Sequence, residues 1–403
     1  MLTEVGHLTY CTNIHAGETW RDHFYALQIN FPAIKEKLSP NKPMGIGLRL
    51  SNEASIDLIK KENLSDFKQW LREHDAYVFT MNGFPYGGFH RIVVKDQVHT
   101  PDWVSNERVE YTLRLFQILA ALIPEGMDGG VSTSPLSYKP WFTNQNQLYD
   151  ARGSATKNII RIIGDLIQIH QSTGKLLHLD IEPEPDGLLE SGTEFIEWFE
   201  NDLLPAGIPI INSKMNISNH KAEDLIKEHL RLCYDVCHFA VGYEDHQTTI
   251  NLLAEKSIKV GKIQISAALK ADMNSPEIKT ESIKENFSRF NEPVYLHQVV
   301  ARTKDGNLLR YPDLPEALNE KDNSLISEWR AHFHVPVFAK KFDLLSSTHD
   351  EIIEVLSIQK KKPFTNHLEV ETYTWEVLPQ NLRLPLRDSI IRELQWAKDI
   401  LEN

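Results

Sequence analysis

The segment L176-L-H-L-D-I-E-P-E-P185 decides how this sequence is read. It begins like a buried strand and then places acids at positions 180, 182 and 184. Strand side chains alternate between two faces. One face here is apolar, and the other carries His178, Asp180 and Glu182. The segment therefore runs an apolar strand directly into a group of carboxylates.

Similar short runs alternate with helical patterns along the whole chain. Ten runs have strand character: 8–13, 45–50, 76–82, 129–134, 176–182, 232–238, 260–266, 295–300, 331–338 and 367–375. Alternating strands and helices predict a parallel sheet. Eight such units close into an α/β barrel of the (β/α)8 TIM type, and 403 residues suit one large barrel with insertions. We therefore expect residues 1–403 to form a single TIM-barrel domain.

Two of the ten runs are surplus to an eight-stranded barrel. The strand-to-helix rhythm breaks late in the chain, so we expect an inserted β-rich segment at about 270–345. The runs 295–301 and 331–338 are either both inserted, or one is a barrel strand and the other is extra. The seventh barrel strand is therefore either 260–266 or 331–338.

Helix boundaries have weaker signals. Ser65 and Ser218 each precede a helical pattern and are candidate helix caps. The residues from Ser389 to Leu401 form an amphipathic pattern typical of a C-terminal helix.

The composition excludes several classes of partner. The chain has 43 basic and 56 acidic residues, a formal net charge of −13, which argues against binding nucleic acid or an anionic membrane surface. Three cysteines are too few for a disulfide framework. No signal peptide or apolar segment long enough for membrane insertion is visible, so we expect a cytoplasmic protein.

Polar rows recur on one face of several strands. Parallel strands are usually apolar on both faces, yet Gln264 lies on such a row in 260–266 and Glu371 lies on another in 367–373. Buried carboxylates that converge in one barrel need a cation, and a divalent metal can be shared by several oxygens. Glu182 and Glu371 end buried strands, where barrel enzymes keep their chemistry. Asp235 and His238 add a carboxylate and an imidazole at a third strand end.

Several of these residues have a structural alternative. His178 is expected to be a hydrogen-bonded core residue, and Asp180 either pairs with a lysine or arginine or faces a substrate. Glu184 follows Pro183 and is expected to be solvated or to cap a loop. At least one of His297, His332 and His334 should reach the site, because H-x-H on a strand points both rings the same way.

Neutral or basic groups at other strand ends could bind a polyhydroxylated ligand. They include His15, Arg49 and Asn82, although Arg49 could equally neutralise acids of the barrel.

The order of these strand-end residues resembles the xylose isomerase-like TIM-barrel superfamily. Its pattern is a Glu after strand five, an Asp with a following His after strand six, a polar ligand after strand seven and a Glu after strand eight. The matching residues are Glu182, Asp235 with His238, Gln264 and Glu371. The resemblance implies a divalent ion (Zn, Mn, Mg, Fe or Co), with Glu182 and Glu371 exchanging protons with a substrate carbon and His238 contacting substrate. Gln264 stands where related epimerases have His, so either His297 or His334 takes its place or the metal is lost.

Longer motifs resemble the EboE family of metabolite traffic proteins. They include N82-G-F-P-Y-G, H178-L-D-I-E-P-E-P-D-G, Y234-D-V-C-H, W329-R-A-H-F-H-V-P-V-F and H367-L-E-V-E-T-Y-T-W. The resemblance covers almost the whole chain. It implies an association with trafficking of secondary-metabolite precursors and with partners encoded in the same gene cluster.

These observations favour a metal-dependent isomerase or epimerase that acts on a small polar, sugar-like or precursor compound. The metal would polarise a carbonyl, and Glu182 or Glu371 would move a proton at the adjacent carbon. The alternative is a binding or carrier protein without turnover. A third hypothesis, a phosphodiesterase resembling endonuclease IV, is disfavoured by the acidic charge.

Overall fold

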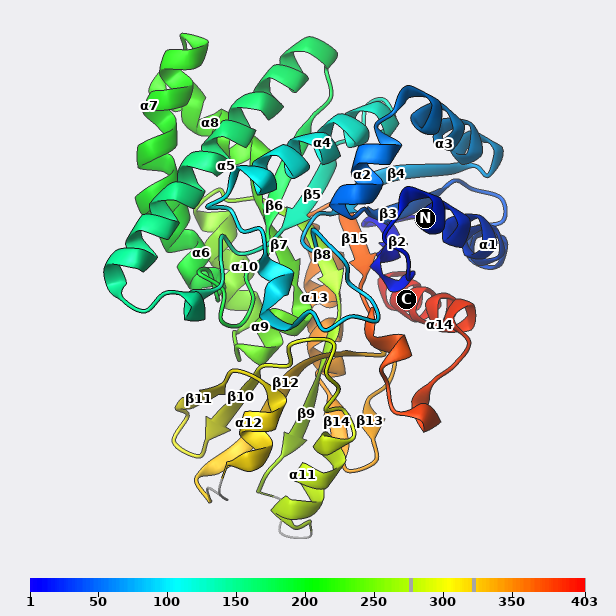
Figure 1. Cartoon of the computed structure of the whole chain (residues 1–403), viewed down its shortest axis with the longest axis vertical. Coiled ribbons are helices and arrows are strands. Elements are labelled where there is room, and N and C mark those ends of the chain that lie inside the picture. The colour runs from blue at the N-terminus through cyan, green and yellow to red at the C-terminus, as the bar shows by residue number, and fades with distance from the viewer. Residues whose placement is uncertain (275–277, 321–323, 403) are drawn as a thin grey trace.

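Eight parallel strands form the centre of the molecule in the computed structural model, which describes residues 1–274, 278–320 and 324–402 (Figure 1). They are β2 (Gly6–Tyr10), β3 (Met44–Arg49), β4 (Ala76–Asn82), β5 (Gly129–Thr133), β6 (Leu177–Ile181), β7 (Leu230–Asp235), β8 (Val260–Ile265) and β15 (His367–Val370). Their order in the sheet is β2-β15-β8-β7-β6-β5-β4-β3, and β1 (Leu2–Thr3) is added antiparallel to β2.

The sheet almost closes on itself between β2 and β3. Cys11 and Gly47 form an isolated parallel bridge. The hydroxyl of Thr9 donates to the carbonyl of Gly45 at 2.8 Å and accepts from the amide of Gly47 at 3.1 Å. The architecture is thus an α/β barrel of the TIM type, as the alternating sequence pattern predicts.

Helices cover the outside of the barrel (Figure 1). They are α1 (Trp20–Leu38), α2 (Asn52–Leu58), α3 (Lys61–Glu73), α4 (Asn106–Leu122), α5 (Gln145–Thr173), α6 (Gly192–Trp198), α7 (Leu204–Met215), α8 (Asn219–His229), α9 (Val236–Val241), α10 (His246–Glu255), α13 (His349–Lys361) and α14 (Leu386–Glu402). Short turns are η1 (Thr12–Ile14), η2 (Lys95–His99), η3 (Lys139–Trp141), the π-helical η4 (Phe199–Leu203), η5 (Thr374–Glu376) and η6 (Gln380–Leu382).

Local sequence explains several helix starts. Ser218 accepts a hydrogen bond from the amide of Lys221 at 3.2 Å and caps α8, as predicted. The prediction for Ser65 is wrong, because that residue lies inside α3, which starts four residues earlier after Lys60. The apolar stripe near the C-terminus becomes α14, which packs beside α1, so the two ends of the chain meet (Figure 1).

A second sheet follows β8 directly and lies beyond one end of the barrel (Figure 1). Its six strands are β9 (Ala267–Asp272), β10 (Val299–Thr303), β11 (Leu308–Tyr311), β12 (Ile326–Val335), β13 (Lys341–Phe342) and β14 (Leu345–Ser347). All its pairs are antiparallel, in the order β11-β10-β12-β9-β14-β13. It also carries α11 (Thr280–Ser288) and α12 (Leu314–Asn319), so this part of the chain is not purely β.

The second sheet settles which late run is the seventh barrel strand. β8, within the run 260–266, lies between β7 and β15 and pairs parallel with both. The run 331–338 instead belongs mostly to β12 and pairs antiparallel with β10 and β9. Because β9 starts two residues after β8 ends, the second sheet is attached at the carboxyl end of the barrel strands.

The barrel interior contains a charged middle layer. Lys262 of β8 donates to Glu369 of β15, and both side chains are fully buried. Glycines on facing strands make room for these acids: a Cβ at Gly47 would overlap the carboxylate of Glu369, and one at Gly261 would overlap that of Asp180. The ion pair fills the middle of the barrel and separates its two ends.

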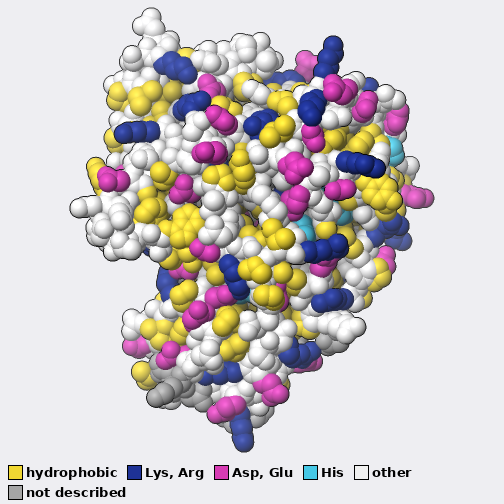
Figure 2. Space-filling model, in the orientation of Figure 1, with side chains coloured by type: hydrophobic (Ala, Val, Ile, Leu, Met, Phe, Trp, Pro, Cys, Tyr) yellow, Lys and Arg dark blue, Asp and Glu magenta, His cyan; other side chains and the backbone are white. Residues whose placement is uncertain are grey.

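The molecular surface is mixed in charge. Figure 2 shows acidic and basic side chains interspersed over one face, so the net negative charge is not gathered into one patch there. Among the described residues, no helix combines the length and apolar character needed to cross a bilayer.

Candidate metal and substrate site

Three carboxylates meet at the carboxyl end of the barrel. Glu182 directly follows β6, Asp235 ends β7, and Glu371 directly follows β15. One oxygen of each lies within 4.8 Å of the others, and all three side chains are buried. Parallel strands place their carboxyl ends at one edge, so residues far apart in sequence become neighbours.

Glu371 is held by three side-chain amides. Its Oε1 accepts hydrogen bonds from Asn13 and Asn82, each at 2.8 Å, and its Oε2 accepts from the amide of Gln264. Donors from three different strand ends therefore fix the orientation of this carboxylate.

Glu182 and Asp235 keep one free oxygen each. Asp235 Oδ1 accepts from the hydroxyl of Ser266 at 2.6 Å and from the amide of His238 at 3.1 Å. Asp235 Oδ2 and Glu182 Oε2 have no hydrogen-bond partner among the described residues. Buried oxygens are rarely left unpaired, so these two atoms indicate a missing positive partner.

The electrostatics of the trio support the same conclusion. Burial, together with the neighbouring Glu371 and Asp235, raises the pKa of Glu182 well above its usual value. Burial and Asp235 likewise raise the pKa of Glu371. For Asp235, burial is outweighed by His238 and His334, and its pKa is lowered. Burial and mutual repulsion thus disfavour the charged forms of Glu182 and Glu371, and a bound cation would offset both effects.

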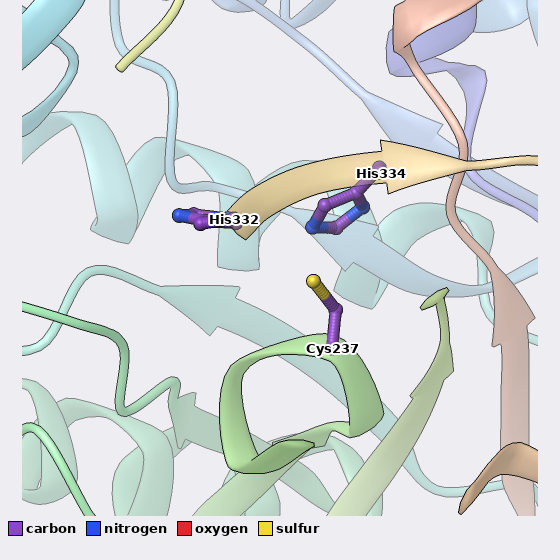
Figure 3. Close-up of side chains that lie close together, drawn as sticks. All are labelled: Cys237, His332 and His334. Carbon is purple, nitrogen blue, oxygen red and sulfur yellow. The ribbon is translucent and has the colours of Figure 1, made fainter. Parts of the chain in front are cut away.

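Histidines line the other side of this site. His238 follows Asp235 on α9, whereas His332 and His334 come from β12 of the second sheet. Figure 3 shows both β12 histidines above α9, with the thiol of Cys237 directed toward that strand. Burial lowers the pKa of His334 to about 4 and also lowers the pKa values of His238 and His332. The rings are therefore neutral near pH 7.

Each of these rings has a fixed tautomer. Nδ1 of His238 faces the carbonyl of Pro183 at 3.0 Å, and Nδ1 of His334 faces the carbonyl of Glu371 at 3.0 Å. Nδ1 of His332 faces Oε1 of Gln298 at 2.8 Å. These oxygens can only accept, so each Nδ1 carries the hydrogen and each Nε2 is left as a lone pair.

Two of the lone pairs face each other. Nε2 of His238 and Nε2 of His332 are 3.1 Å apart. Two acceptors at that distance repel unless a proton or a cation lies between them.

The donor atoms fit a divalent ion. Glu182, Asp235 and Glu371 form one set of possible ligands, and Asp235, His238 and His334 form a second set that shares Asp235. Glu184, His238 and His332 form a third set. Cys237 could also join His332 and His334, but burial raises its thiol pKa, so it is a poorer ligand. The residues present therefore suit either an oxygen-rich or a nitrogen-containing coordination sphere.

A small pocket, a cavity of about 60 Å³, opens onto these groups. Glu182, Glu371, His238, His332 and His334 all line it. Its remaining wall includes aromatic side chains, namely Phe84, Phe89, Tyr295 and Tyr373. Its volume holds only a few water molecules, so it is smaller than the sites that enclose a drug-sized ligand.

Four predicted site residues lie elsewhere or have another partner. His297 does not line the pocket, since Nδ1 faces the carbonyl of His332 at 2.9 Å and Nε2 faces Glu292 at 2.7 Å. Arg49 pairs with Glu18 at 2.8 Å, and His15 contacts Tyr10 at 3.1 Å. Asp180 lies deeper in the barrel and accepts from His178 at 2.6 Å, so neither of the two expected alternatives for Asp180 is its closest contact.

Gln264 has a different role from the expected one. Its amide donates to Glu371, and its Oε1 accepts from the thiol of Cys233. In this arrangement Gln264 positions a carboxylate through its NH2 group. Asn82, in contrast, lines the pocket as expected and also binds Glu371.

The expectation for Glu184 is wrong. Its side chain is buried, lines the pocket and lies 3.3 Å from Nε2 of His99. Burial and the charge of Asp235 raise its pKa. The flanking prolines suggested a solvated loop, but η2 and the second sheet cover this loop. No strand pattern in the sequence marks His99 as a pocket residue, whereas Tyr373 lies on the same row as Glu371 in the run 367–375.

Comparison with family models gives no match, and no curated protein matches the chain. Solved structures do match it. A xylose isomerase-like TIM-barrel protein from Mycobacterium smegmatis, in complex with magnesium, aligns with a TM-score of 0.50 at 8% identity, over 100% of this chain and 99% of that chain.

Two further solved structures align over 98% of both chains. A D-tagatose 3-epimerase-like protein has a TM-score of 0.49 at 9% identity, and the IolI protein with a bound zinc atom has 0.47 at 12% identity. At such low identity, the likeness to the mycobacterial protein concerns the fold alone. The chain therefore shares the TIM-barrel fold of that mycobacterial protein.

Proposed function

We propose that this chain is a metal-dependent isomerase or epimerase of the EboE family, built as one barrel domain with an inserted segment. Its substrate would be a small polar carbonyl compound, either sugar-like or a precursor of a secondary metabolite. The observation that supports the proposal most is the buried trio of Glu182, Asp235 and Glu371, with two oxygens that lack a partner among the described residues.

The trio would hold the ion, with His238 and His334 as further donors on the side of Asp235. A bound divalent ion would supply polarisation of a carbonyl and of a neighbouring hydroxyl. The trio suits a divalent ion because three buried carboxylates that lie close together need a compensating positive charge.

Glu182 and Glu371 differ in how strongly hydrogen bonds restrain their carboxylates. Glu371 is clamped by Asn13, Asn82 and Gln264, so it is suited to hold a fixed position. Glu182 has a free Oε2 and a raised pKa, and it lines the pocket. We therefore assign Glu182 the proton transfer at the substrate carbon, since a general base works best with a pKa near the operating pH.

The remaining groups orient and enclose the substrate. His238 and His332 line the pocket, and their Nε2 lone pairs would accept hydrogen bonds from substrate hydroxyls. Phe84, Phe89 and Tyr373 would exclude water from the reacting carbon.

Exchange of substrate hydrogen with solvent tests the reaction class. We expect the protein, loaded with Zn²⁺, Mn²⁺ or Mg²⁺, to incorporate deuterium from D2O next to the carbonyl of at least one compound in a panel of ketoses and aldoses. Glu182→Gln should lose this exchange while retaining a bound ion. Glu371→Gln should lose both exchange and the ion.

A matched control is Glu393→Gln, because Glu393 is also buried but contacts Thr372 and Trp375 outside the pocket. The Glu393→Gln variant should keep both the deuterium exchange and the bound ion. Full metal occupancy with unchanged turnover in Glu371→Gln would contradict the proposal. Retention of an unchanged ligand, without exchange in any variant, would identify a carrier instead.

A further inference from the structure

A second group of metal-ligating side chains lies at the opposite, amino-terminal end of the barrel. Asp128 immediately precedes β5, His178 is the second residue of β6, and His367 is the first residue of β15. One ligand atom from each lies within 4.8 Å of the others. His178 and Glu182 are four residues apart on one strand, as are His367 and Glu371, which separates the two ends by roughly 13 Å.

A carboxylate orients one of these histidines. Nδ1 of His178 donates to Asp180 Oδ1 at 2.6 Å, so Nε2 carries the lone pair. Asp180 fits beneath Gly130 and Gly261, where a Cβ on either glycine would overlap its oxygens. A carboxylate behind a histidine is the usual support of a metal-bound imidazole, because it fixes both the tautomer and the ring orientation.

The ring nitrogens nearest Asp128 have no hydrogen-bond partner among the described residues. They are Nε2 of His178 and Nε2 of His367, and Nδ1 of His367 also lacks a partner there. The two side chains are 0% and 1% exposed. Phe79 packs edge-on against the ring of His367, with centroids 4.9 Å apart, and so holds it in place.

The distances suit an ion better than direct contact. Nε2 of His178 is 3.6 Å from Asp128 Oδ2, and Nε2 of His367 is 3.4 Å from Asp128 Oδ1. A good N–H···O bond is about 2.9 Å long. Two ligands of a tetrahedral zinc ion, each about 2.0–2.1 Å from the metal, are about 3.3 Å apart. The two observed N–O distances are therefore close to the ligand–ligand distance in such a tetrahedron.

The surrounding charges leave a net negative charge at the cluster. Arg231 donates to Asp128 at 2.8 Å and pairs with Glu228 at 3.1 Å, and Glu228 also pairs with Lys259 at 2.5 Å. Asp128, Asp180 and Glu228 together carry one more negative charge than Arg231 and Lys259 offset, which favours a cation. The side chain of Asp128 is 19% exposed, which leaves a path for the ion and a position for water.

We propose that Asp128, His178 and His367 bind a divalent transition-metal ion of the zinc class at the amino-terminal end of the barrel. Two imidazoles and one carboxylate are a common ligand set for such ions. β6 and β15 are separated by β7 and β8 in the sheet, so the ion would cross-link strands that do not pair. Barrel enzymes react at the other end, which makes the role of this ion structural.

Metal counting in the full-length protein tests this site independently of the site around Glu182, Asp235 and Glu371, which we call the mouth of the barrel. After loading with Zn²⁺ and removal of free metal, His367→Gln and Asp128→Asn should each hold one equivalent less than the wild type, whatever number the mouth retains. His229→Gln should match the wild type, because His229 is a buried histidine bonded to the carbonyl of Leu177 and is not part of the cluster.

X-ray absorption at the zinc edge in Glu371→Gln should show two imidazole ligands on the ion that remains, and a further His367→Gln change should remove that signal. Circular dichroism verifies that each variant is folded. Equal zinc content in wild type, His367→Gln and Asp128→Asn would overturn the proposal. If the mouth binds no metal or the protein has no isomerase activity, we still expect the wild type to hold one zinc equivalent more than His367→Gln or Asp128→Asn.

Discussion

Glu182→Gln should change the stability of this protein in opposite directions with and without metal. In chelator, we expect the variant to be more stable than the wild type, because one of three mutually repelling carboxylates is replaced by a neutral amide of similar shape. With saturating Zn²⁺, we expect the variant to be less stable, because it loses a ligand that the wild type uses.

The spacing of the trio gives the size of the effect. Two unit charges no more than 4.8 Å apart, as in the trio, repel by about 3.5 kcal/mol or more at an effective dielectric constant of about 20. Burial and the neighbouring acids raise the pKa of Glu182, which disfavours its charged form and reduces the relief. We therefore expect the metal-free variant to gain about 1–3 kcal/mol in unfolding free energy. The wild type should gain about 4 kcal/mol when free zinc exceeds Kd a thousandfold, and the variant should gain less.

Denaturant unfolding at pH 7.5 (about three pH units above the pKa of an ordinary carboxyl) measures both differences, in chelator and in buffered zinc. Glu393→Gln is the control, since its carboxyl is buried outside the trio and its metal-dependent gain should equal that of the wild type. If Glu182→Gln is destabilised equally in chelator and in zinc, the three carboxylates do not form a repelling cation site.

Three further results are expected. Lys262→Met should lower the unfolding free energy by about 3–5 kcal/mol in denaturant titrations, because it leaves the fully buried Glu369 unpaired, and adding Glu369→Gln should restore part of the loss. Asn82→Ala removes a donor to Glu371, so isothermal titration should show metal affinity falling about 10–100-fold, with little change in melting temperature. Burial raises the pKa of Glu393 to about 7, so between pH 4.5 and 7 this carboxyl binds a proton in the folded state that the unfolded chain has released. The free energy of unfolding therefore falls as pH rises through that window, by about 3 kcal/mol relative to Glu393→Gln. Parallel pH profiles of stability in the wild type and the variant would contradict this.

The barrel and its polar interior could be predicted from the sequence because both depend on local periodicity. Strand alternation places Glu182 and Glu371 inward, and the carboxyl ends of parallel strands meet at one edge whatever the loops do. That rule identified three acids from three distant segments that the structure brings together.

Hydrogen-bond choice and loop burial could not be predicted in the same way. The side-chain oxygen of Gln264 accepts a hydrogen bond from the thiol of Cys233, and its NH2 group donates to Glu371. No sequence pattern predicts which end of the amide faces the carboxylate. Glu184 is buried because segments distant in sequence cover its proline-flanked loop. Asp128 has no strand pattern of its own, so its meeting with His178 and His367 depends on the closure of the barrel.

The strand β12 would widen the choice of metal donors at the carboxyl end of the barrel. The barrel alone would offer carboxylates, which suit Mg²⁺ and Mn²⁺, with a single imidazole from His238, whereas His332 and His334 of β12 would add further borderline nitrogen donors that suit Zn²⁺ and Co²⁺. The docking of the second sheet on the barrel would thus act as a selectivity filter for ions. A homologous barrel with a shorter 267–347 segment should shift toward magnesium even if every acid were kept.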